Sequence, residues 1–198
     1  MICGLCAGMF GVELDEIIEK TVEHYRGLTS FYAEFEQIFC DEVSGTCASY
    51  DGKIYFLEPN FFRMEIDEPK KIYVGDSISL WIYLPEEKRA IRQTMTGMPF
   101  HINPDMFLTD YDKRYDAALS DDTTSSYEVI LTPLDETELY EKIIISISKQ
   151  TFKIGALAVY DEIGSENKYT FQKFETNKKI ARDMFIFKPP SGTQIDEF

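Results

Sequence analysis

The strongest structural signal in the chain is the stretch Tyr55–Pro69, "YFLEPNFFRMEIDEP". Two runs rich in large apolar side chains flank a Glu-Pro-Asn break, which is typical of two strands joined by a turn. In the second run, alternation places Phe62, Met64 and Ile66 on one face and their neighbours on the other. These side chains could therefore face the protein's own core, a partner or an apolar ligand.

The same period of two residues recurs along most of the chain. In "SFYAEFEQIF", residues 30–39, Phe31, Ala33, Phe35 and Phe39 share one face, which Gln37 interrupts. Further strands are predicted at 52–57, 61–66, 71–74, 80–84, 89–93, 114–119, 127–132, 140–148, 154–160, 169–174 and 185–188. Such a long antiparallel sheet must curl to bury one face, so the predicted fold class is mainly β (α+β) with a strongly curved sheet.

Two helical segments are expected beside this sheet. Residues 13–28 carry apolar side chains at helical spacing, and Gly27 is a stop signal. Asn103 followed by Pro104 is a cap and first-turn proline for a second, short helix. The apolar side chains of the second segment, Met106, Phe107 and Tyr111, indicate that it lies over a surface.

Length and charge limit the domain organisation and the partners. The chain has 198 residues, and residues 13–198 suit a single domain. The net charge of −15 argues against nucleic acid and against an anionic membrane surface as the main partner. Residues 1–12 are apolar and uncharged, and we interpret them as the end of a secretory signal peptide. The alternative is an apolar N-terminal arm of the folded protein.

Cys40 and Cys47 flank "DEVSGT", in which Ser44-Gly45 is a turn signal. A loop from Glu42 to Gly45 would place the two cysteines opposite each other on paired strands, within reach of a disulfide. Two free buried thiols are the alternative. A metal site would need more ligands than this pair offers.

Signatures of enzymes are sparse, and we expect no catalytic residue, metal or cofactor. The histidines, His24 and His101, lack metal-ligand spacing, and the G-x-S-x-G, H-E-x-x-H and phosphate-loop motifs are absent from the sequence. The adjacent carboxylates Asp67-Glu68 and Asp121-Asp122 are explained by chance in so acidic a chain. From pattern alone, the excess of apolar side chains fits either a packed barrel core or a ligand cavity.

Several motifs, in order along the chain, carry a resemblance to a known family. They are "SFYAEFEQ", "GKIYFLEPNFFRMEIDEP", "GDSISLWIYLPEEKRA", "GMPF", "YEVILTP" and "FIFKPPSGTQI". Together they resemble the outer-membrane lipoprotein carrier family, LolA, over residues 13–195. The resemblance implies an incomplete β-barrel whose two helices act as a lid over an apolar cavity.

The resemblance also implies a function. Family members carry acylated lipoproteins through the periplasm from an inner-membrane ABC transporter to an outer-membrane acceptor, without catalysis. We expect the same of this chain, acting as a monomer. The alternatives are a related lipid or lipoprotein sensor or acceptor, a lipid hydrolase, and a structural β-domain that binds another envelope protein.

Site residues follow from the resemblance and the strand pattern. We expect the acyl-binding wall to contain Phe35, Phe62, Met64, Ile66 and Phe100, and the lid contacts to be Leu14, Ile18, Tyr25 and Phe107. One position departs from the family, in which a basic residue before Pro-Asn helps to latch the lid. Here that residue is Glu58, whose carboxylate accepts hydrogen bonds but cannot donate them, so the same latch cannot form.

Overall fold

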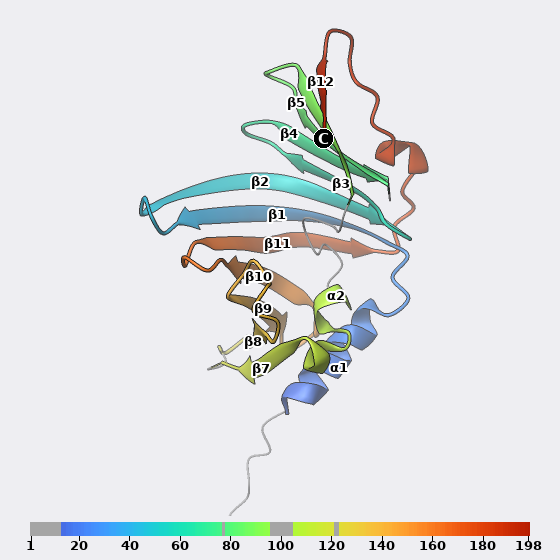
Figure 1. Ribbon diagram of the computed structural model, residues 1–198. Coiled ribbons are helices and arrows are strands. Elements are labelled where there is room, and N and C mark those ends of the chain that lie inside the picture. The colour runs from blue at the N-terminus through green and yellow to red at the C-terminus, as the bar shows by residue number, and fades with distance from the viewer. Residues whose placement is uncertain (1–12, 77, 96–104, 121–122) are drawn as a thin grey trace, which may run out of the picture.

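A single twelve-stranded sheet forms most of the molecule (Figure 1). This computed structural model describes residues 13–76, 78–95, 105–120 and 123–198. The first half of the chain contains α1 (Leu14–Tyr25), β1 (Ser30–Asp41), β2 (Thr46–Leu57), β3 (Phe61–Ile66), β4 (Lys71–Asp76), β5 (Ser79–Leu84) and β6 (Arg89–Thr94). The second half contains α2 (Asp105–Leu108), η1 (Tyr111–Lys113), β7 (Tyr115–Leu119), β8 (Ser126–Pro133), β9 (Lys142–Ser148), β10 (Ile154–Tyr160), β11 (Glu166–Thr176), η2 (Arg182–Phe185) and β12 (Gln194–Glu197).

The strand order is β12-β6-β5-β4-β3-β2-β1-β11-β10-β9-β8-β7. β1 lies near the middle and pairs with β2 on one side and with β11 on the other, so it joins two meanders into one sheet. The sheet is strongly curved, and its edge strands β7 and β12 do not pair with each other. The predicted fold class, a mainly β protein with an incomplete barrel, is confirmed.

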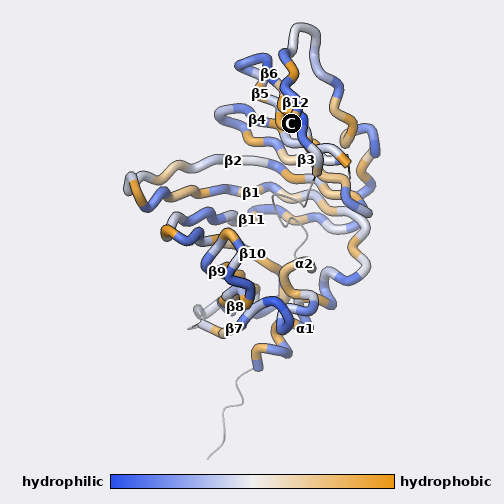
Figure 2. The backbone as a smooth tube through the Cα atoms, viewed as in Figure 1, coloured by the Kyte–Doolittle hydropathy of each residue, from blue (hydrophilic) through white to orange (hydrophobic). Residues whose placement is uncertain are grey.

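Alternation of apolar and polar residues along the strands explains the register (Figure 2). In β3, Phe62, Met64 and Ile66 are buried, and the residues between them are partly exposed. The two-residue period of the quoted stretch therefore assigned its side chains to the correct faces.

The apolar stripe of α1 packs against the sheet. Ile17, Ile18 and Tyr25 are buried, and the chain leaves the helix through Gly27, whose φ of +73° favours glycine. The prediction of a helix over 13–28 is confirmed to within a few residues. No helix among the described residues is long and apolar enough to span a membrane.

Two expectations about the C-terminal region are wrong. The predicted strand at 185–188 is the end of η2 followed by a non-strand segment. There, Phe185 is fully buried and the ring of Phe187 packs against Trp81 and Tyr83, so the segment is held by side chains rather than by strand pairing. The sheet is also not wholly antiparallel, because β12 pairs in parallel with β6.

The hairpin of β1 and β2 extends beyond the predicted strands. Cys40 pairs with Cys47 across the hairpin, and a disulfide joins them. The connecting loop runs from Glu42 to Gly45, because Asp41 pairs with Thr46. The disulfide fixes the tip of this long hairpin.

Candidate ligand-binding cavity

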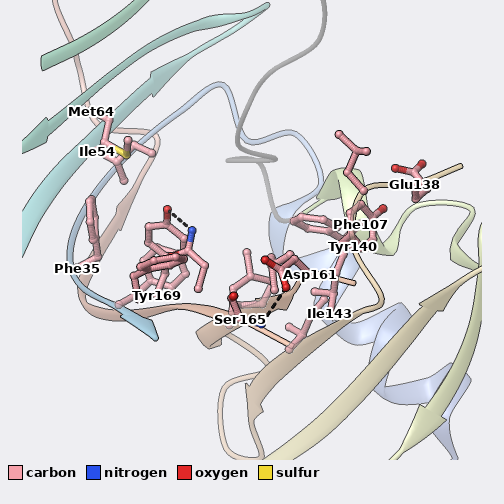
Figure 3. A pocket seen from close by; sticks show the side chains of 18 of the residues that line it. Phe35, Ile54, Met64, Phe107, Glu138, Tyr140, Ile143, Asp161, Ser165 and Tyr169 are labelled. Carbon is pink, nitrogen blue, oxygen red and sulfur yellow. Dashed lines mark hydrogen bonds between the residues drawn. The ribbon is translucent and has the colours of Figure 1, made fainter. Parts of the chain in front are cut away.

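A cavity of about 470 Å³ lies on the concave side of the sheet (Figure 3). Its wall is mostly aliphatic and aromatic, with a few polar groups. The described residues that line it are Phe31, Phe35, Phe39, Ile54, Met64, Phe107, Thr137, Glu138, Leu139, Tyr140, Ile143, Ile145, Ile154, Leu157, Val159, Asp161, Ser165, Asn167, Tyr169 and Phe171.

The cavity has an open end, and elsewhere its wall is covered. Among the lining residues, Phe107 of α2 and Ile154 are buried. At the open end Leu139 is 86% exposed and Phe39 is 37% exposed, although both line the cavity. A ligand can therefore enter beside Leu139.

Glycine makes room for an important part of the wall. A Cβ atom at position 52 would lie 2.5 Å from Cζ of Phe35 and 2.6 Å from the carbonyl oxygen of Glu65. Any side chain at this position would therefore displace the Phe35 ring or the neighbouring strand. Gly52 lets the Phe35 ring approach β2 closely, and this ring forms part of the cavity wall.

The expected acyl-binding residues are divided between wall and core. Phe35 and Met64 line the cavity. Phe62 and Ile66 are buried on the same face of β3 as Met64 but are not among the lining residues. The Phe62 ring covers Gly75 so closely that a Cβ atom at that glycine would collide with ring atoms Cε1 and Cδ1. Phe100 lies outside the described residues.

The expected lid residues all belong to the main core cluster or pack against it. Ile18 and Tyr25 are buried in the main core cluster, and Leu14 packs against that cluster. Phe107 both belongs to the core cluster and lines the cavity. α1 and α2 are in contact with each other, as the resemblance implies for a lid.

Two hydrogen bonds fix the ends of α1. The hydroxyl oxygen of Tyr25 accepts from the backbone N–H of Ile154, with 2.9 Å between oxygen and nitrogen. At the other end of α1, the Tyr111 hydroxyl of η1 donates to the carboxylate of Asp15. This bond to Asp15, together with burial, raises the pKa of Tyr111 to about 12.

Glu58 lies in the turn between β2 and β3 and is exposed. Its backbone N–H donates to the carbonyl oxygen of Thr29 over 2.9 Å. Its carboxylate makes no hydrogen bond or ion pair within the described part of the chain.

Polar groups interrupt the apolar wall near the open end. The Tyr140 hydroxyl forms a hydrogen bond with that of Tyr115, with 3.0 Å between the oxygens. Burial is the larger cause, and this hydrogen bond the second, of a raised pKa for Tyr140. Asn167 donates through Nδ2 to the Tyr169 hydroxyl over 3.4 Å. Burial likewise raises the pKa of Tyr169, so its phenol stays neutral near pH 7.

Sequence reasoning missed most of the wall formed by β9, β10 and β11. The alternation in "KIIISIS" of β9 marks Ile143, Ile145 and Ile147 as one face. Only the first two line the cavity, and Ile147 belongs to the core alone. The alternation of residues along β9 therefore identified the inward face of this strand. It could not show which of its side chains border the cavity. The described residues also contain no group of three or more His, Cys, Asp or Glu side chains placed to hold a metal ion.

Comparison with known proteins identifies the family. A family model described as outer membrane lipoprotein carrier protein LolA matches residues 26–188. The chain belongs to this family. A LolA-family relative from Aliivibrio fischeri, named outer-membrane lipoprotein carrier protein, is 24% identical over 201 residues, covering 99% of this chain and 96% of the relative. A relative of the same name from Erwinia tasmaniensis is 25% identical over 173 residues, covering 85% and 81%.

A solved structure supports the fold. An uncharacterized conserved protein from Thermus thermophilus superposes with a TM-score of 0.60 at 12% identity, covering 91% of this chain and 97% of that chain. The family's description is that of a carrier and names no reaction.

Proposed function

We propose that this chain shields the acyl chains of lipoproteins in the cavity on the concave face of its sheet. The observation that carries the proposal is the cavity itself, an apolar space of about 470 Å³ with an opening beside Leu139. Each methylene that leaves water gains about 0.8 kcal/mol, so such a wall strongly favours an acyl chain over water. Membership of the LolA family supports this choice of cargo.

The proposed route runs through the periplasm, from an inner-membrane ABC transporter towards an outer-membrane acceptor. The Cys40–Cys47 disulfide supports an oxidising compartment such as the periplasm. The chain acts as a monomeric carrier without a cofactor. The lining residues that the structure describes include no His, Cys, Lys or Arg, which supports binding rather than catalysis.

The two helices act as the lid in this proposal. Phe107 of α2 contributes directly to the wall, and the contact between Asp15 and Tyr111 ties the N-terminal end of α1 to the segment after α2. This tie takes the place of the basic latch, which Glu58 cannot form. Because the hydrogen bond between Asp15 and Tyr111 is exposed to solvent, the tie is weak enough to open when cargo enters or leaves.

Two exposed aliphatic positions make a matched test. Leu139 lines the open end of the cavity, whereas Val43 lies at the β1–β2 turn and does not line it; they are 86% and 81% exposed. Leu139→Glu and Val43→Glu add the same charge without disturbing the core. We expect only Leu139→Glu to weaken uptake of a fluorescent acyl probe by the purified chain.

Cargo is identified by purifying the chain from the periplasm and analysing bound species by mass spectrometry. Acylated peptides or lipoproteins in the wild-type sample, reduced in Leu139→Glu, are the expected result. Protein free of lipid, combined with no uptake of the probe, would contradict the proposal.

A further inference from the structure

A row of polar groups crosses the apolar concave face near its open end. Gln37 interrupts the apolar face of β1 between Phe35 and Phe39, both of which line the cavity. Its Nε2 donates to Oδ1 of Asn167 on the neighbouring strand β11 over 2.9 Å. Gln37 does not line the cavity, whereas Asn167 does.

The bond from Gln37 sets the orientation of the Asn167 amide. Because Oδ1 accepts from Gln37, Nδ2 is directed towards Tyr169, and both Asn167 and Tyr169 line the cavity. One N–H of Nδ2 donates a long hydrogen bond to the Tyr169 hydroxyl, with 3.4 Å between nitrogen and oxygen. The other N–H has no acceptor among the described residues, so it remains available to a ligand.

A second donor lies two residues earlier on the same side. Ser165 is 4% exposed and lines the cavity. Its Oγ accepts a long hydrogen bond of 3.3 Å from the backbone N–H of Glu42. In the described structure its hydroxyl proton has no acceptor, which is costly for so deeply buried a group. An acceptor on a ligand would satisfy it.

The charges around this row select the kind of head group. Asp161 and Glu138 also line the cavity, and the described lining residues contain no cation. An ionised fatty acid would place its carboxylate near two like charges. A neutral ester or amide carbonyl needs only hydrogen-bond donors, which Asn167 and Ser165 supply.

We infer that Asn167 and Ser165 form a subsite for the neutral carbonyl group of an acyl ester or amide, with Gln37 as the positioning residue for Asn167. The acyl chain then extends from this subsite along the apolar wall. The inference rests on the proposed function and adds the two residues that hold the carbonyl group of the bound acyl chain.

The test compares three ligands of similar length: methyl laurate, tridecane and laurate at pH 8. Each competes with a fluorescent hydrophobic probe for the purified, disulfide-intact chain. Asn167→Asp keeps the size of the side chain, retains an acceptor for Gln37 and removes the donor. Asn60→Asp is the matched control, because Asn60 is exposed in the β2–β3 turn, does not line the cavity, and gains the same charge.

We expect Asn167→Asp and Ser165→Ala each to lower the affinity for methyl laurate by about 3- to 10-fold, the effect of one lost hydrogen bond. Tridecane should bind all variants within about twofold, because it makes no hydrogen bond. In wild-type protein, laurate should bind more weakly than methyl laurate. Asn60→Asp should resemble wild type, and thermal unfolding of every variant establishes that it is folded.

Each other outcome has a definite meaning. If Asn167→Asp lowered the affinities for methyl laurate and tridecane equally, Asn167 would only support the wall, and the proposed subsite would be refuted. Laurate binding as tightly as methyl laurate would overturn the preference for a neutral head group. If wild-type protein bound none of the three ligands, the proposed function would fail, and the subsite with it.

Discussion

The hydrogen bond between α1 and the first residue of β10 offers a direct test of how this helix, the proposed lid, is held. Tyr25 is 2% exposed, and its hydroxyl accepts the backbone N–H of Ile154 over 2.9 Å. Tyr25→Phe removes only the hydroxyl. The ring contact with Phe174, with centroids 5.7 Å apart, remains possible. The substitution therefore isolates one buried hydrogen bond.

The expected loss of unfolding free energy is about 1–3 kcal/mol, because the Ile154 N–H is left buried without a partner. For a domain of this size, each kcal/mol lowers the melting temperature by about 2–4 °C. Burial raises the pKa of Tyr25 to about 12, so its hydroxyl is neutral at pH 8 and ionisation does not enter the comparison.

Urea unfolding measures the free energy, and amide hydrogen exchange measures the protection of Ile154. Tyr83→Phe is the control, since the Tyr83 hydroxyl makes no hydrogen bond within the described residues and its ring is only partly buried. We expect faster exchange at Ile154 in Tyr25→Phe alone. A free energy within about 0.3 kcal/mol of wild type, with Ile154 still fully protected, would refute the role given to this bond.

Three further predictions concern the hairpin, the wall and pH. Replacing Cys40 and Cys47 by Ser should lower the unfolding free energy, measured in urea, by about 2–3 kcal/mol, because the disulfide closes a short loop. A loss below about 0.5 kcal/mol would contradict this prediction. Gly52→Ala should displace the Phe35 ring, lower the melting temperature and weaken uptake of an acyl probe. Unchanged uptake would show that Phe35 does not form part of the binding wall. Burial, and then the charge of Lys153, lower the pKa of His24 below its usual 6.5. As pH drops below about 6.5 the unfolded chain therefore binds this proton more readily than the folded chain, and the unfolding free energy should fall. Urea titrations across this pH range should show a smaller fall in His24→Gln.

The strand pattern predicted the faces of the sheet but not the shape of its concave side. Phe62 and Met64 are two residues apart on one face of β3, and both were expected to contact an acyl chain. The structure places Met64 on the cavity wall, whereas the Phe62 ring fills the space over Gly75. Alternation reports on which side of a strand a residue lies. Whether the side chain meets space or another residue depends on long-range curvature and on neighbours such as Gly75, which the local pattern does not contain.

The C-terminal segments show a different limit. β12, with the sequence "QIDE", has no run of apolar residues to mark it, because it is a short edge strand held by backbone pairing with β6. Near Phe185, large side chains suggested a strand, but they anchor a turn and an extended segment against β3 and β5 instead. Local propensity was overridden in both places by a partner distant in sequence.

The proposed carrier must hold its cargo firmly and still release it, and we assign these two tasks to different elements. Burying about ten methylenes against the wall would gain about 8 kcal/mol, whereas one hydrogen bond to Asn167 would add about 1 kcal/mol. The apolar wall therefore supplies the affinity, and the polar row fixes which end of the ligand lies at the mouth. Release requires the wall to open. The element best placed to open it is the lid, because Phe107 belongs to the wall while the exposed tie between Asp15 and Tyr111 contributes little stability. A partner that separates α1 from η1 would thus weaken cargo binding without competing for the cavity itself.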